Sequence, residues 1–130
     1  MHGKLRYQMA QNLFNVSNPF FIMKNFSDAQ KEVDILVQQM GGYWSPLAML
    51  ASVVEEVGEL AREINALEKI KVKKPEERTN PIDEELADTL FSIICIANHY
   101  QVDLGASLDR VLDKYRKRDK NRFTKNDQEP

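Results

Sequence analysis

The sequence predicts an all-α fold, in which four main helices form an antiparallel bundle that is completed by oligomerisation. Three observations lead to this prediction. The chain has 130 residues, of which 42% are hydrophobic and 29% charged, so it is long enough for one domain with a modest core. Glycine and proline are scarce, with five of each, which leaves long stretches free to be helical. Apolar residues recur at helical spacing, whereas alternating strand patterns are nearly absent.

Each predicted helix follows a residue whose side chain commonly accepts a hydrogen bond from the first helical turn. These candidate N-caps are Ser27, Ser45, Asn80 and Asp103. The corresponding helices extend over about residues 28–40, 46–70, 81–100 and 104–121. Pro46 and Pro81 preorganise the first turn of two of them. The first helix is expected to end at Gly41-Gly42, and residues 71–79, which include Pro75, are expected to form a solvated connection.

These helices place one domain over residues 27–125, with a short segment on either side. Residues 1–26 contain three bases and no acid. Two interpretations of this N-terminal extension stay open, because it either packs on a partner chain or is partly disordered. Residues 126–130 are expected to form a disordered tail.

The composition favours a cytoplasmic protein. The one cysteine, Cys95, cannot form an internal disulfide and suits a reducing compartment. No apolar run approaches the ~18 residues of a membrane span, and no small-residue cleavage site follows Lys4 and Arg6, so neither a membrane span nor a signal peptide is expected. Nucleic-acid binding is not expected either, because the net charge is −2 and no aromatic residues interleave with the bases.

Acidic residues are concentrated in the middle of the chain, where 11 of the 20 lie between Glu55 and Asp88. The apolar residues of the second predicted helix form one stripe, which is the expected core face. They are Leu50, Val53, Val54, Val57, Leu60, Ala61, Ile64 and Leu67. Glu56 lies on the shoulder of this stripe, Glu59 and Glu63 lie just beyond it, and Glu55 points nearly opposite. Glu56 and Glu59 are therefore expected to face one point together.

The third predicted helix is apolar on nearly every side, which is typical of a buried helix. One face consists of Ile82, Leu86, Leu90, Ile93, Ile94, Ala97 and Tyr100. The polar stripe consists of Glu84, Glu85, Asp88, Ser92 and His99. We expect this stripe to face a cleft. Four helices of about a hundred residues cannot cover every side of such a helix, so a partner chain is expected to complete the core.

The energy of like charges decides between two interpretations of the acids. On an exposed helix each pair costs only about 0.2–0.5 kcal/mol, so a solvated acidic face is common. In a partly dry cleft the repulsion grows several-fold, and a cation or a raised pKa must offset it. Carboxylate pairs from two antiparallel helices suit a hard ion, which predicts Mg²⁺ as the cofactor with Mn²⁺ as the alternative. The candidate metal ligands are Glu56, Glu59, Glu85 and Asp88.

Two other kinds of metal centre fit the sequence less well. A di-iron bundle uses two Glu-x-x-His pairs, and neither His2 nor His99 stands three residues after a glutamate. The absence of nitrogen and thiolate ligands points away from zinc.

The fourth predicted helix ends in a basic segment, and 8 of the 18 bases lie between Arg110 and Lys125. Lys114, Arg118 and Arg122 follow one another at one-turn intervals, so they share a face. A lysine point charge and an arginine fork together suit a polyphosphate chain. Cations in the last turns also favour the helix dipole, which is the alternative explanation. Beside the acidic cluster, the basic face is interpreted as a grip for a triphosphate.

The carboxylate motifs resemble those of the MazG-like family of all-α nucleoside triphosphate pyrophosphohydrolases. The pattern EExxE occurs as EEVGE in residues 55–59, and ExxD occurs as ELAD in residues 85–88. The match extends to the segments YWSPLAMLASVVEEVGELAREIN, EELADTLFSIICIAN and LDRVLDKYRKRDKNRFT. The chain is similar to the short, single-domain bacterial members over roughly residues 28–125.

This resemblance implies an enzyme that hydrolyses a nucleoside triphosphate, usually a deoxy or non-standard one, to the monophosphate and pyrophosphate. It matches Lys114 and Arg118 to the basic pair that holds phosphates, and the four candidate ligands to the metal-binding acids. Asn98 and Trp44 are further candidates for contacts with sugar or base. Cys95 stands where many members have asparagine, which leaves the selectivity open. Family members are dimers or tetramers of dimers, so a homodimer or homotetramer is expected.

The predicted mechanism is in-line attack by a water whose pKa is lowered by one or two bound Mg²⁺ ions. Glu59 or Glu55 is expected to orient this water, and Lys114 and Arg118 to stabilise charge on the leaving pyrophosphate. The biological task implied is housecleaning of the nucleotide pool.

Two alternative functions stay open. The first is a non-catalytic helical nucleotide-sensing or oligomerisation module that keeps the metal site. The second is a structural bundle whose acids only keep it soluble.

Overall fold

A computed structural model describes residues 25–120 and residue 122, and it confirms the all-α prediction. This part of the chain contains four helices and no strand. The helices are α2 (Phe26–Gln39), α3 (Pro46–Leu67), α4 (Ile82–His99) and α5 (Leu104–Arg118). None of them is long and apolar enough to cross a membrane. The predictions for residues 1–24 and for the tail 126–130 lie outside the described residues.

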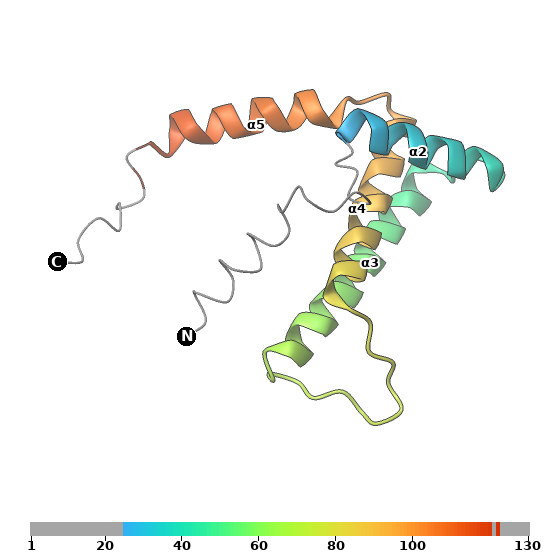
Figure 1. Ribbon diagram of the computed structural model, residues 1–130, viewed down its shortest axis with the longest axis vertical. Helices are drawn as coiled ribbons and strands as arrows, with labels where there is room; N and C mark the ends of the chain where they lie inside the picture. Colours follow the sequence, from blue (N-terminus) through green and yellow to red (C-terminus); the bar gives the residue numbers. More distant parts are fainter. Residues whose placement is uncertain (1–24, 121, 123–130) are drawn as a thin grey trace, which may run out of the picture.

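The central feature of the fold is the pair α3 and α4, which lie side by side in opposite directions (Figure 1). α2 packs across the end of this pair at which α4 finishes. α5 starts at the same end, contacts α2 and projects away from the pair (Figure 1). The bundle is therefore built around one long antiparallel contact, and much of the surface of α3 and α4 carries no neighbour within the described chain.

Two of the four predicted N-caps are confirmed. Ser45 and Asp103 each accept a hydrogen bond from the backbone N–H three residues later, at 3.3 and 2.9 Å. The prediction for Ser27 is wrong, because the N-cap of α2 lies two residues earlier at Asn25, whose side chain accepts the equivalent bond at 2.8 Å. Asparagine caps a helix as well as serine does. Asn80 does not cap α4 either, since the following proline occupies the N-cap position without a side-chain bond.

The ends of α2 and α3 are set by backbone turns. α2 ends as predicted at Gly41-Gly42, whose φ angles of 105° and 97° favour glycine. α3 ends at Leu67 and not near Ile70, because the chain reverses at Lys69, which has a φ of 57°. The backbone N–H of Ile70 then donates to the carbonyl of Asn65 at 2.9 Å, which satisfies one of the last helical carbonyls.

The core lies where α2 crosses the α3–α4 pair. Its buried residues are Val37, Met49 and Cys95, against which Val33, Tyr43, Phe91 and Ile96 pack. Each of these three helices, or the turn between α2 and α3, contributes a side chain. The core thus holds α2 and the α2–α3 turn in place beside the carboxylates of α3 and α4.

The predicted core face of α3 is wrong within the described chain. Most of that apolar stripe is exposed, including Leu50, Val54, Val57, Ile64 and Leu67. α3 instead turns toward α4 the side that carries Met49 and Glu63, both buried. On α4 the large residues Leu86 and Leu90 are likewise exposed. A hydrophobic stripe shows that a face is to be covered, but not which neighbour covers it.

Candidate metal and nucleotide site

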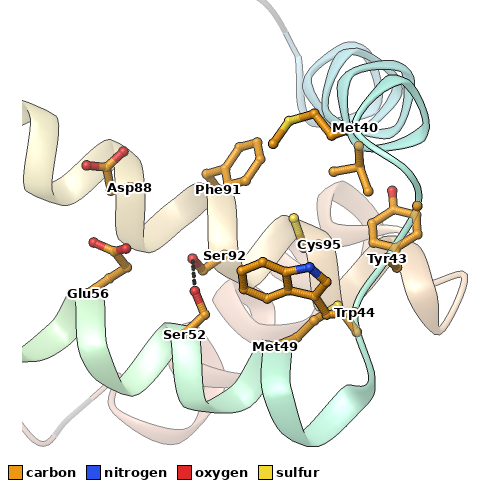
Figure 2. A pocket seen from close by; sticks show the side chains of 12 residues that line it. Met40, Tyr43, Trp44, Met49, Ser52, Glu56, Asp88, Phe91, Ser92 and Cys95 are labelled. Atoms are coloured by element: carbon orange, nitrogen blue, oxygen red, sulfur yellow. Dashed lines mark hydrogen bonds between the residues drawn. The ribbon is translucent and has the colours of Figure 1, made fainter.

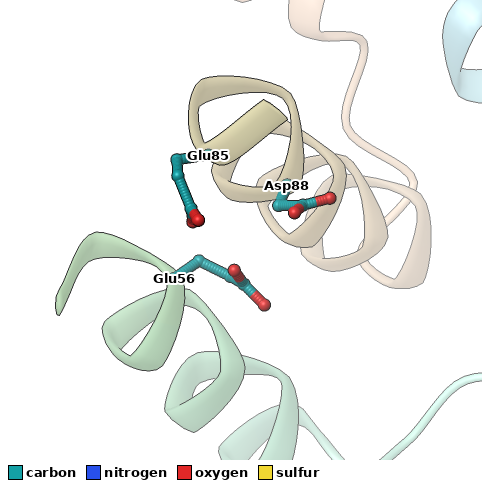
Figure 3. Close-up of side chains that lie close together, drawn as sticks. All are labelled: Glu56, Glu85 and Asp88. Atoms are coloured by element: carbon teal, nitrogen blue, oxygen red, sulfur yellow. The ribbon is translucent and has the colours of Figure 1, made fainter. Parts of the chain in front are cut away.

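Three carboxylates meet between α3 and α4. Glu56 comes from α3, and Glu85 and Asp88 come from successive turns of α4. One carboxylate oxygen from each lies within 4.8 Å of the others. Figure 3 shows the side chains of Glu56 and Glu85 reaching into the space between the helices, with Asp88 beside them. We call these three residues the acidic cluster.

The acidic cluster is partly withdrawn from water, so its charges interact strongly. Glu85 is only 2% exposed, whereas Asp88 lies at the open side. Burial, and then the charges of Asp88 and Glu85, raise the pKa of Glu56 above its ordinary value. Oxygen donors that repel one another in a partly dry place are relieved by a divalent cation. The residues present therefore fit a hard ion such as Mg²⁺.

A pocket of about 290 Å³ adjoins the acidic cluster. Its lining is mostly apolar and includes Met40, Tyr43, Trp44, Met49, Phe91 and Cys95. Glu56 and Asp88 lie at one end of this pocket, and Met40, Tyr43 and Trp44 lie at the other (Figure 2). An apolar hollow that opens onto clustered carboxylates is the arrangement expected for a ligand with one flat apolar part and one charged part.

The polar groups inside the pocket are few. The hydroxyls of Ser52 and Ser92 lie 3.4 Å apart across the α3–α4 contact (Figure 2). Cys95 is buried, and burial raises the pKa of its thiol, so it is a neutral wall residue. Trp44 lines the pocket and is 68% exposed, which leaves the ring face free for stacking on a flat ligand. This is the place that suits the predicted contact between Trp44 and a base.

Asn98 lies on the other side of Tyr43, away from the acidic cluster. Its side-chain amide donates to the carbonyl of Gln30 at 2.8 Å and to the hydroxyl of Tyr43 at 3.0 Å. Its oxygen accepts a bond from the Gln30 amide at 2.9 Å. Tyr43 in turn donates to Asp34 at 2.7 Å, and burial followed by this bond raises the pKa of Tyr43 to about 12. Asn98 therefore holds α2 and the Tyr43 wall of the pocket, and its predicted contact with substrate stays a prediction.

Two predicted acids stand outside the cluster. Glu59 lies one turn from Glu56, but its carboxylate pairs with Arg62 at 2.5 Å. Glu55 is exposed beside Glu56. Neither belongs to the three acids whose oxygen atoms meet. Their predicted roles, as ligand or as the group that orients water, stay predictions.

The basic residues of α5 form a face of their own. Lys114 Nζ and Arg118 Cζ lie 5.2 and 4.8 Å from the centroid of the Tyr115 ring, so both cations make cation–π contacts with this ring. Arg118 also pairs with Asp119 at 2.8 Å, and Arg122 approaches the same carboxylate at 3.5 Å. Because α5 projects from the α3–α4 pair, this basic face lies away from the acidic cluster of its own chain (Figure 1).

Several pocket residues were not predicted from the sequence. Examples are Tyr43, Met49, Ser52 and Phe91. A signal for two of them exists, because Met49 and Ser52 precede Glu56 at helical spacing on the same side of α3. That side is less apolar than the stripe next to it, so hydrophobic spacing alone predicts the stripe as the buried face. Tyr43 precedes α3 and has no periodic pattern to reveal it.

Comparison with known proteins identifies the family. The profile of the MazG nucleotide pyrophosphohydrolase domain matches residues 44–123. The uncharacterized protein YpjD of Bacillus subtilis (strain 168) is 43% identical over 106 residues, which cover 81% of this chain and 96% of YpjD. The crystal structure of YpjD superposes with a TM-score of 0.65 over 73% of this chain and 98% of that chain. The Bacillus-conserved MazG protein, a nucleotide pyrophosphohydrolase, gives a TM-score of 0.62 at 45% identity, over 78% of this chain and 99% of that one. The chain therefore belongs to the MazG nucleotide pyrophosphohydrolase family.

Proposed function

We propose that the protein is a Mg²⁺-dependent pyrophosphohydrolase that converts an NTP or dNTP to the monophosphate and pyrophosphate, in a cytoplasmic housecleaning role. One observation carries this proposal: in a chain of this family, the acidic cluster lies at the end of an apolar pocket with room for a base. The pocket favours the flat base, and the acids favour the metal that accompanies a triphosphate.

The residues of the chain have distinct tasks in this proposal. Trp44, Tyr43 and Phe91 hold the base and exclude water from it. Glu56, Glu85 and Asp88 hold the metal, with Mn²⁺ as the alternative ion. The bound ion supplies neutralisation of phosphate charge and a lower pKa for a coordinated water.

Glu59 is the acid that we propose to join the cluster on substrate binding. It lies one helical turn from Glu56 and is held only by an exposed pair with Arg62. Both side chains of this pair are open to solvent, so the pair is weak and is readily exchanged for a ligand or for a water. Glu59, or the neighbouring Glu55, then orients the attacking water.

The basic face is proposed to act on the pyrophosphate through a partner chain in a homodimer or homotetramer. Lys114 and Arg118 lie on α5, which projects from the α3–α4 pair and therefore away from the acids of its own chain (Figure 1). α5 ends at Arg118 and not near residue 121 as predicted, so Arg122 lies in the turn beyond it. The exposed apolar stripe of α3 supports association, because soluble monomers rarely expose such a continuous patch.

The direct test is pyrophosphate release from a panel of NTPs and dNTPs, with and without Mg²⁺. The proposal expects release that requires the divalent ion and produces the monophosphate in equal amount. Folded protein that binds a nucleotide without turning over any member of the panel would instead support the non-catalytic sensing module. Release without added metal in the presence of EDTA would contradict the metal assignment.

A further inference from the structure

A buried ion pair lies beside the acidic cluster without belonging to it. Glu63 of α3 is 3% exposed, and its carboxylate accepts a hydrogen bond from Lys73 of the α3–α4 connection. This bond holds the pKa of Glu63 below its ordinary value. Lys73 also donates to the carbonyl of Arg78 at 2.8 Å. The prediction of a solvated connection is therefore wrong at Lys73, whose side chain is 11% exposed.

Asn80 connects this ion pair to the acidic cluster. Its backbone N–H donates to Glu63 Oε1 at 3.4 Å, and its side-chain amide donates to Glu85 Oε1 at 2.7 Å. Asn80 was expected to cap α4, but its amide is used for Glu85 instead. One residue thus touches both the buried pair and a member of the cluster.

The bond from Asn80 matters because Glu85 is buried, so water has little access to its carboxylate and cannot replace this bond. Glu85 is the most buried of the three acids, and the short Asn80 bond fixes one of its oxygens. An amide N–H can only donate, so it occupies one carboxylate oxygen of Glu85 and leaves the other oxygen for a ligand contact. The groups that orient a metal ligand commonly change ion affinity by about 10–100-fold when they are removed.

We propose that Asn80 is a positioning residue that holds the Glu85 carboxylate ready for a divalent cation, and that the Glu63–Lys73 ion pair holds Asn80 in place. The inference rests on the metal site of the proposed function. It assigns to the α3–α4 connection, which carries none of the predicted site residues, a part in metal binding. The connection contributes through Lys73, which anchors it to α3, and through Asn80, which reaches the site.

The test measures Mn²⁺ binding to folded protein without nucleotide, by the loss of the free-ion electron paramagnetic resonance signal. Asn80→Ala removes the donor to Glu85, and we expect it to weaken Mn²⁺ binding about tenfold.

A second variant tests the ion pair. Glu63→Leu combined with Lys73→Met removes both charges together, which avoids leaving one buried charge unpaired. We expect a smaller loss from this double variant, because Asn80 keeps its amide but loses its anchor. Glu77→Ala is the matched control, since Glu77 lies exposed in the same connection and its carboxylate accepts a hydrogen bond from the Lys74 backbone N–H and not from a residue of the acidic cluster or of the Glu63–Lys73 pair.

Adding Asn80→Ala to the Glu63→Leu, Lys73→Met variant separates positioning from general loosening. If the pair acts through Asn80, the triple variant binds Mn²⁺ no more weakly than Asn80→Ala alone. Wild-type affinity in folded Asn80→Ala would overturn the inference while leaving the metal site intact. Equal losses in Glu77→Ala and Asn80→Ala would overturn it too. Wild-type protein that binds no Mn²⁺ would overturn the metal site and this inference together.

Discussion

At the scale of single residues, Glu56 shows how the site opposes the stability of the metal-free fold. Burial and the neighbouring acids raise its pKa above the value of 4.5 in the unfolded chain. Between pH 4.5 and the raised pKa, the Glu56 carboxyl therefore stays protonated in the metal-free fold, whereas it is ionised in the unfolded chain. The contribution of this group to stability is fully present below pH 4.5 and is lost as the pH rises through the raised pKa.

Glu56→Gln is neutral at every pH and should remove this loss. In EDTA at pH 7, we expect the variant to have a higher free energy of unfolding than the wild type, with a difference that closes toward pH 4.5. Mg²⁺ should stabilise the wild type more than the variant, and hydrolysis should be lost. Urea unfolding at several pH values measures the first effect, and Glu84→Gln on the exposed side of α4 is the control. A variant that is less stable than wild type in EDTA at pH 7 would contradict the assignment.

The residues of the site could be predicted only as far as helical spacing determines them. Glu56, Glu85 and Asp88 were predicted together because each lies at a fixed phase on a long, regular helix, and these three do meet. Glu59 satisfies the same spacing, but its side chain is long enough to pair with Arg62 instead. Spacing fixes the position of a Cα atom and not the choice of rotamer. The hydrogen bond from Asn80 to Glu85 could not be predicted, because Asn80 lies in an irregular connection, where spacing predicts only a helix cap.

At the scale of elements, α3 was predicted correctly as a helix and incorrectly in its orientation. Its capping serine, its proline and its length follow from local chemistry. Its buried side depends on which helix it meets, and Glu63 faces inward because Lys73 of the connection neutralises it. The Glu63 carboxylate, which the sequence pattern assigns to the polar side of α3, therefore lies in the interior. Because this side of α3 faces inward, the apolar stripe with Val54 and Ile64 faces outward.

α2 is attached to the rest of the fold by the apolar core and by the hydrogen bonds of Asn98, and the second contact gives a prediction for that element. Asn98→Ala removes three hydrogen bonds to Gln30 and Tyr43, each of which contributes about 0.5–1.5 kcal/mol. We expect faster amide hydrogen exchange in α2 than in wild type, while exchange in the α3–α4 contact changes less. Gln38→Ala, exposed on the same helix, is the control. Unchanged stability and exchange with a raised KM for nucleotide would show that Asn98 contacts substrate instead.

At the scale of the whole molecule, the acidic cluster and the basic face lie on different parts of the described chain. The acids lie in the α3–α4 contact, whereas Lys114 and Arg118 lie on the projecting α5 (Figure 1). The surface of the α3–α4 pair includes exposed Val54, Val57 and Leu86, which are costly to leave in water at about 25 cal/mol per Å² of apolar area. Association of two chains would bury this surface and bring α5 of one chain toward the acids of the other.

Mixing two inactive variants tests whether the basic face acts across chains. Glu56→Gln lacks an acid and Arg118→Ala lacks the proposed phosphate contact, so we expect each alone to have little activity. If the face acts on the partner, a mixed dimer contains one complete site, because the Arg118→Ala chain supplies Glu56 and the Glu56→Gln chain supplies Arg118. Random pairing of equal amounts then gives about one quarter of the wild-type rate. Light scattering first establishes that the chains associate, and a chain carrying both substitutions, mixed with each single variant, is the control that should restore nothing. If both residues act within one chain, no dimer holds a complete site, and the mixture stays as inactive as its components.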